Sequence, residues 1–179
     1  MSARRYPGVF RDKEIIINIT FIFGGIYQEI MTNGFKIIGI ATRTTNKDNQ
    51  AQTDLGKLWG DFFAKDLMNS ITNKCSNEIL AIYTDYKSDF TEEYTTIIGM
   101  PVATLDEVPA GLVGREFPAE NFQKFIARGD MPQAVVDVWM DVWNRDAELN
   151  RNYTYDYELY GAKSQNGAES EVEIFISVK

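Results

Sequence analysis

The segment Tyr155–Tyr160 (YDYELY) mixes acidic and aromatic side chains in an alternating order that could bind a cation. The two-residue repeat of a β-strand would place Asp156, Glu158 and Tyr160 on one face of this segment. The opposite face would then carry Tyr155, Tyr157 and Leu159. We therefore expect one face of the strand to present two carboxylates beside a phenol.

The direction in which Glu158 points decides what this segment can do. If it points into the protein, its carboxylate is costly to bury unless a cation or hydrogen-bond donors meet it. A bound organic cation would meet that requirement. In the alternative, Asp156 and Glu158 lie in water on the outer face of a sheet, and the sequence alone leaves both arrangements open.

Further aromatic residues could complete a cage around such a ligand, because the face of an aromatic ring attracts an organic cation. The last apolar segment, Glu171–Val178, puts Phe175 on its less apolar side, where we expect a ligand wall rather than core packing. The other candidates are Trp59, Tyr83, Tyr94, Trp139 and Trp143. For the tryptophans, packing of helix faces on the sheet is an equal alternative.

The composition excludes several other chemistries. The 179-residue chain has no histidine and one cysteine, Cys75, so it has no zinc finger, no imidazole base and no internal disulfide. The acidic clusters at Glu92–Glu93 and Asp146–Glu148 lack a metal-binding pattern. We expect no cofactor, no metal and no catalytic residue. A net charge of −8 disfavours direct nucleic-acid binding and favours a cationic ligand.

The order of the predicted elements repeats once along the chain. The first half, residues 31–105, contains a strand at Gly34–Thr45, a helix from Thr53 or Asp54 to about Ile71, and a hairpin of Glu78–Tyr86 with Glu93–Pro101. The second half, residues 106–179, contains a strand at Leu112–Pro118, a strand or turn at Asn121–Arg128, a helix at Met131–Asp146 and a hairpin of Tyr153–Tyr160 with Glu171–Val178. We predict an α+β domain with two pseudo-symmetric strand-helix-strand-strand units, a mostly antiparallel sheet and a ligand cleft between the halves.

Residues 1–30 differ from the rest of the chain. The apolar run Ile15–Ile26 is too short to span a bilayer and lacks a small-residue cleavage site after it, so we expect no membrane association and a cytoplasmic location. The segment is interpreted as sequence upstream of a start at Met31. An added strand or helix that mediates association is the alternative.

From Met31 onward the chain resembles the GyrI-like small-molecule-binding proteins, also known as the effector-binding domain of AraC-type bacterial transcription activators. The segments that carry the resemblance, in order, are FKIIGIATRTTN, LGKLWGDFF, EILAIYTDY, EYTTIIGMPV, VPAGLVGREFP, AVVDVWMDVW, YDYELYG and VEIFISV. Some members, including ones carried on integron cassettes, similarly lack an attached DNA-binding helix-turn-helix. The resemblance makes Glu158 the central acid of a pocket between the halves, with Trp59, Tyr83, Tyr94 and Phe175 as its aromatic residues.

The resemblance implies a protein that senses or sequesters a small, cationic or amphipathic aromatic molecule, with a partner protein or a homodimer for any regulatory output. One alternative is a hydrolase of reactive small molecules in which Glu158 acts on a water. Another is a protein inhibitor of a topoisomerase. One departure from the family pattern is the final FISV, where a tyrosine commonly stands in place of Phe175.

Overall fold

The computed structural model describes residues 17–22 and 25–179, with side chains from Ile30 onward. Its strands are β1 (Ile17–Ile22), β2 (Gly25–Thr32), β3 (Phe35–Thr45), β4 (Ile79–Thr84), β5 (Glu93–Val102), β6 (Val113–Phe117), β7 (Glu120–Arg128), β8 (Tyr155–Tyr160) and β9 (Glu171–Ser177). Its α-helices are α1 (Gln50–Ala64), α2 (Leu67–Ser70), α3 (Gln133–Asn144) and α4 (Asp146–Leu149). Within the described residues, these strands form one antiparallel sheet.

The centre of the sheet has the predicted pseudo-symmetry. The strand order is β1-β2-β7-β9-β8-β4-β5-β3-β6, so β4 and β8 pair at the middle. Outward from this pair, β4 is followed by β5 and then β3, and β8 is followed by β9 and then β7. The units are β3-α1-β4-β5 and β7-α3-β8-β9, which confirms the α+β prediction of two strand-helix-strand-strand units. The strand or turn expected at Asn121–Arg128 is a strand, β7, and it begins the second unit.

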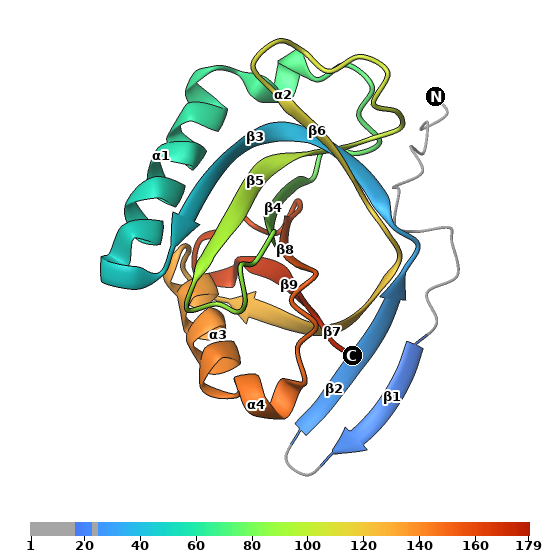
Figure 1. Cartoon of the computed structure of the whole chain (residues 1–179), viewed down its shortest axis with the longest axis vertical. Coiled ribbons are helices and arrows are strands. Elements are labelled where there is room, and N and C mark those ends of the chain that lie inside the picture. The colour runs from blue at the N-terminus through green and yellow to red at the C-terminus, as the bar shows by residue number, and fades with distance from the viewer. Residues whose placement is uncertain (1–16, 23–24) are drawn as a thin grey trace.

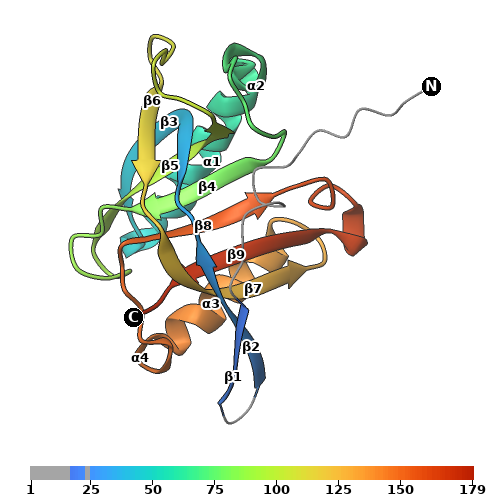
Figure 2. The ribbon, with the colours of Figure 1, turned by 90° about the vertical axis from the view of Figure 1, so that its right-hand side faces the viewer.

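The sheet is strongly curled (Figures 1 and 2). Within it, Gly39 of β3 and Gly99 of β5 lie directly opposite each other, where the two backbones approach closely. A Cβ atom on Gly39 would lie 2.1 Å from the carbonyl oxygen of Ile98. Only glycine therefore permits this close approach of the two backbones.

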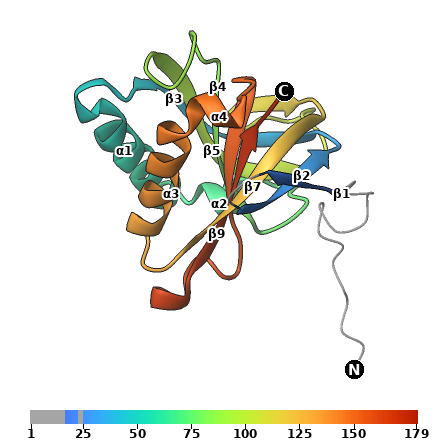
Figure 3. The same ribbon diagram turned by 90° about the horizontal axis from the view of Figure 1, so that it is seen from below.

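Helices α1 and α3 lie next to each other on one face of the sheet (Figure 3). Helix α3 buries Val135, Trp139 and Val142, which share a face because they are four and three residues apart. Helix α1 buries Leu58 and Phe62 against strands of the first half. We refer to this side of the sheet as the helical face.

Helix α1 differs from its predicted bounds at both ends. It begins at Gln50 rather than at Thr53 or Asp54, because the Asp54 carboxylate accepts a hydrogen bond from Thr44 of β3 (2.7 Å) instead of capping the helix. It ends at Ala64 rather than near Ile71, since Asp66 has a left-handed backbone conformation (φ 50°) that separates α1 from the short α2.

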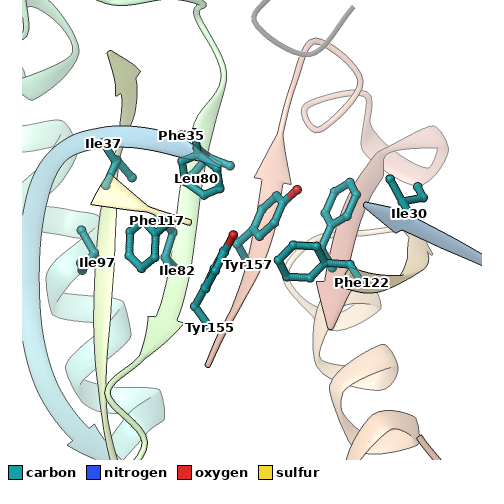
Figure 4. Packing of buried hydrophobic residues seen from close by; sticks show 11 residues of the cluster. Ile30, Phe35, Ile37, Leu80, Ile82, Ile97, Phe117, Phe122, Tyr155 and Tyr157 are labelled. Carbon is teal, nitrogen blue, oxygen red and sulfur yellow. The ribbon is translucent and has the colours of Figure 1, made fainter. Parts of the chain in front are cut away.

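The opposite, concave face of the sheet buries an aromatic core (Figure 4). The rings of Tyr157 and Phe175 stack with centroids 4.4 Å apart and planes 9° apart. The hydroxyl of Tyr155 donates a hydrogen bond to the carbonyl oxygen of Pro118 (2.6 Å), which ties β8 to the turn between β6 and β7. Side chains on both faces are thus buried at the centre of the sheet.

Strand β2 includes Met31, the residue at which we expected the domain to begin from the sequence. It pairs with β1 on one side and with β7 on the other, from Gln28 opposite Lys124 to Thr32 opposite Glu120. Residues 25–30 therefore belong to the sheet, whereas the expectations for residues 1–16 lie outside the described part of the chain. In the described residues, no helix is long and apolar enough to cross a membrane.

Candidate functional site

Glu158 lies in the middle of β8 on the helical face, directly opposite Ala81 of β4, and is 2% exposed. Three neutral aromatic groups donate hydrogen bonds to its carboxylate. Oε1 accepts from the Tyr83 hydroxyl (2.8 Å) and the Trp139 indole N–H (2.6 Å), and Oε2 accepts from the Tyr160 hydroxyl (2.7 Å). Strands β4 and β8 and helix α3 each supply one donor.

The electrostatic state of this carboxylate is unusual. Burial raises the pKa of Glu158 above its ordinary value of 4.5, while the hydrogen bonds from Tyr160, Trp139 and Tyr83 act in the opposite direction. Among residues 30–179, no lysine or arginine forms an ion pair with Glu158. The ionised form is therefore stabilised by neutral dipoles alone.

Aromatic rings extend the site on both sides of Glu158. Tyr83 contacts Trp139 edge-on, with centroids 5.0 Å apart, and contacts Tyr94 at 6.0 Å. The Tyr94 hydroxyl donates to Asn46 Oδ1 (2.7 Å) rather than to the Glu158 carboxylate. On the other side, the ring of Trp59 meets that of Tyr160 edge-on at 5.0 Å. Six of the predicted site residues are thus in one cluster, namely Glu158, Trp59, Tyr83, Tyr94, Trp139 and Tyr160.

Phe175 does not join this cluster. It is opposite Tyr157 in the β8–β9 pair, so it lies on the concave face, and its ring stacks on Tyr157. The residue of β9 opposite Glu158 is Ile174, which packs with Trp139 on the helical face. The placement of Phe175 in a pocket with Glu158 is corrected by this register, because neighbouring residues of a strand point to opposite faces.

An open cavity of about 700 Å³ adjoins the cluster. Its walls come from both halves of the domain: Trp59 and Phe63 from α1, Met68 from α2, Met131 and Pro132 before α3, and Tyr160 at the end of β8. Glu158, Tyr83 and Trp139 do not line it. The volume lies within the range of pockets that hold drug-sized ligands.

Phe63, Met68 and Met131 were not predicted as site residues. The spacing of the sequence could have identified Phe63, because it is four residues after Trp59 and so shares its helix face. In the structure the two rings stack with centroids 5.9 Å apart. Met68 and Met131 had no such signal. They reach the cavity through the short helix α2 and the turn before α3, which only the folded chain brings together.

Asp156, on the same face of β8 as Glu158, has a different environment. Its Oδ2 accepts from Arg151 Nη2 (2.6 Å) and from the Tyr86 hydroxyl (2.7 Å), and its Oδ1 accepts from the backbone N–H of Ser177 (2.8 Å). The Asp156 and Arg151 side chains are both fully buried. This acid is neutralised within the protein and has a structural role.

Comparisons with known proteins agree with this architecture. The integron cassette protein from the mobile metagenome of Vibrio cholerae is 29% identical and superposes with a TM-score of 0.68, covering 93% of this chain and all of that one. The structure of SAV2435 bound to tetraphenylphosphonium has a TM-score of 0.72 at 18% identity, covering 86% of this chain and 93% of that one. The putative transcriptional regulator YobU of Bacillus subtilis (strain 168) is 23% identical over 148 residues, which are 80% of this chain and 92% of that protein.

The family model described as Cass2, integron-associated effector binding protein, matches residues 30–178. This match spans both pseudo-symmetric halves and all the residues around Glu158. It confirms the GyrI-like resemblance seen in the sequence. The chain therefore belongs to the Cass2 family of integron-associated effector binding proteins.

Proposed function

We propose that this protein binds a small organic cation with aromatic groups at Glu158 and the adjoining cavity, and so senses or sequesters it. The observation that carries the proposal is a buried carboxylate with three neutral donors and no cationic partner among residues 30–179. Such a group attracts a cation strongly, because the surrounding low dielectric weakens the interaction little.

The surroundings of the carboxylate suit the rest of such a ligand. Trp59, Tyr83, Trp139 and Tyr160 offer ring faces and edges, and Met68 and Met131 offer adaptable apolar surface. The net charge of −8 would also raise the local concentration of cations. SAV2435, whose solved structure holds tetraphenylphosphonium, has the same fold. Together these features favour a lipophilic cation over a neutral or anionic ligand.

The regulatory setting is part of the same proposal. Family membership and the likeness to the putative regulator YobU support a sensing role, and we propose that it is exercised in the cytoplasm. The acidic charge disfavours direct contact with nucleic acid. A response to the ligand would therefore pass through a partner protein or a second copy of the chain.

Isothermal titration calorimetry with two probes tests the proposal. Tetraphenylphosphonium supplies a lipophilic cation, and triphenylphosphine oxide supplies a neutral molecule with similar phenyl groups. Glu158→Gln should lower the affinity for tetraphenylphosphonium by at least about tenfold, since a buried charge partner is lost. Its affinity for triphenylphosphine oxide should stay nearly unchanged.

Glu107→Gln is the matched control, because it makes the same chemical change at an exposed position. It should leave both affinities unaltered. Equal binding of tetraphenylphosphonium by the parent and Glu158→Gln would overturn the proposal.

A further inference from the structure

Tyr160 has two roles that no other described residue combines. Its side chain lines the open cavity, and its hydroxyl donates to Glu158 Oε2 at 2.7 Å. Tyr83 and Trp139, the other donors to this carboxylate, do not line the cavity. A molecule in the cavity therefore meets Tyr160 before it can reach Glu158.

We infer that Tyr160 is a latch between two compartments of the site and selects for cations by its hydrogen bond to Glu158. This inference rests on the proposed function and extends it. The outer compartment is the apolar cavity, which accepts aromatic groups of either charge state. The inner compartment is the carboxylate, which a ligand contacts only after the Tyr160 hydroxyl has left Oε2.

The balance of interactions explains the selectivity. Opening the latch breaks a hydrogen bond to a charged group that is held away from water. A cation offsets this loss because it replaces a neutral donor with a full positive charge. A neutral molecule offers no replacement, so it remains in the outer compartment and leaves the latch closed.

The position of Tyr160 allows this movement. It is the last residue of β8, only partly buried, and is followed by the turn that begins at Gly161. Its ring meets that of Trp59 edge-on in the wall of the cavity, with centroids 5.0 Å apart. Tyr83, in contrast, is buried inside β4 and packs against both Tyr94 and Trp139. Tyr160 thus has the open cavity on one side, into which its ring can turn, whereas Tyr83 is enclosed by protein.

Association kinetics measured by surface plasmon resonance on the full chain test the latch. Tyr160→Phe keeps the ring and removes the hydrogen bond. It should raise the association rate constant of tetraphenylphosphonium by at least about tenfold, the factor that corresponds to one weak charge-assisted hydrogen bond. The rate for triphenylphosphine oxide should stay within about threefold of the parent.

Tyr83→Phe is the matched control, because it removes one donor from the same carboxylate without changing the wall of the cavity. Its association rate for tetraphenylphosphonium should stay within about threefold of the parent. Equal acceleration by both variants, or none by Tyr160→Phe, would overturn the latch. If Glu158→Gln still has a lowered affinity for tetraphenylphosphonium in that case, the proposed binding site is supported and only the latch is rejected. If the parent does not bind tetraphenylphosphonium, both proposals fall.

Discussion

Arg151 Nη2 donates a 2.6 Å hydrogen bond to Asp156 Oδ2, and both side chains are fully buried. Glu158 lies two residues away on the same face of β8 and has three aromatic donors in place of a cation. Two buried acids on one strand are thus held in different ways. The first prediction separates them by removing the cation of the structural pair.

Arg151→Met should destabilise the protein by about 3–5 kcal/mol, because it leaves Asp156 charged and buried without a counterion. Urea denaturation gives this free energy of unfolding. The double variant Arg151→Met with Asp156→Asn should recover much of the loss. Arg128→Met, which breaks a more exposed ion pair with Glu171, should cost less than about 1 kcal/mol. Similar small losses for Arg151 and Arg128 would contradict this account of Asp156.

The two tryptophans of α3 should differ in their effect on stability. Trp139 is buried and bonded to Glu158, whereas Trp143 is half-buried and stacks on Phe90 at 5.7 Å. Trp139→Ala should lower the free energy of unfolding by about 3–5 kcal/mol. Trp143→Ala should cost less, because part of its ring already faces water. Equal losses in thermal or urea unfolding would show that both rings are core residues of the same kind.

Proton binding by Glu158 should affect both stability and ligand affinity. Its pKa is raised in the native state, so the native protein holds this proton to higher pH than the unfolded chain does. The contribution of Glu158 to the free energy of unfolding therefore falls as the pH rises from the ordinary value of 4.5 through the raised value. Glu158→Gln lacks this loss, so its stability relative to the parent should increase over the same pH range.

Cation affinity should change in the opposite sense, since only the ionised carboxylate attracts a cation. The residues that face Glu158 from β4, β5, β8 and α3 are Tyr83, Tyr94, Tyr160 and Trp139. Burial raises the pKa of each of these tyrosines above its ordinary value, so they stay neutral in this range. Calorimetry from about pH 5 to about pH 8 should show tighter binding of tetraphenylphosphonium as the pH rises. A flat profile, such as Glu158→Gln should give, would exclude Glu158 as the anchor.

Two glycines should respond to alanine with opposite signs. A Cβ on Gly60 of α1 would meet open space, so Gly60→Ala should raise the free energy of unfolding by about 0.5–1 kcal/mol through helix propensity. A Cβ on Gly39 would clash with the backbone of β5, so Gly39→Ala should lower it by about 1–3 kcal/mol or more. Thermal unfolding of the two variants measures both effects. A stabilised Gly39→Ala would show that the pairing of β3 with β5 does not need this close approach.

The sequence predicted most of the fold because its signals were local. Period-two and helical patterns located β3, β4, β5, β8, β9 and α3 close to their observed bounds. The ends of α1 were not predictable in this way. They depend on Thr44, which bonds Asp54 from another element, and on the left-handed conformation of Asp66. The pairing of β2 with β7 joins segments about a hundred residues apart, and no local pattern specifies it.

The candidate site, like the fold, was predictable only where local sequence patterns determine it. Alternation correctly separated Glu158 and Tyr160 from Tyr157, but it did not say which face of β9 meets which face of β8. That register places Phe175 on Tyr157, and since the curled sheet buries both of its faces, polarity could not identify the ligand side. The different roles of Asp156 and Glu158 depend on Arg151, which lies outside the strands.

The arrangement of the tryptophans gives the protein a built-in optical reporter. The chain has three, and each lies in the helical layer: Trp59 in the cavity wall, Trp139 on the Glu158 carboxylate and Trp143 beside Trp139. Indole emission responds to a nearby charge, so ionisation of Glu158 or arrival of a cation should change the spectrum of Trp139. Intrinsic fluorescence can therefore follow occupancy of the site without a label, and single tryptophan-to-phenylalanine variants can assign the signal to the outer or the inner compartment.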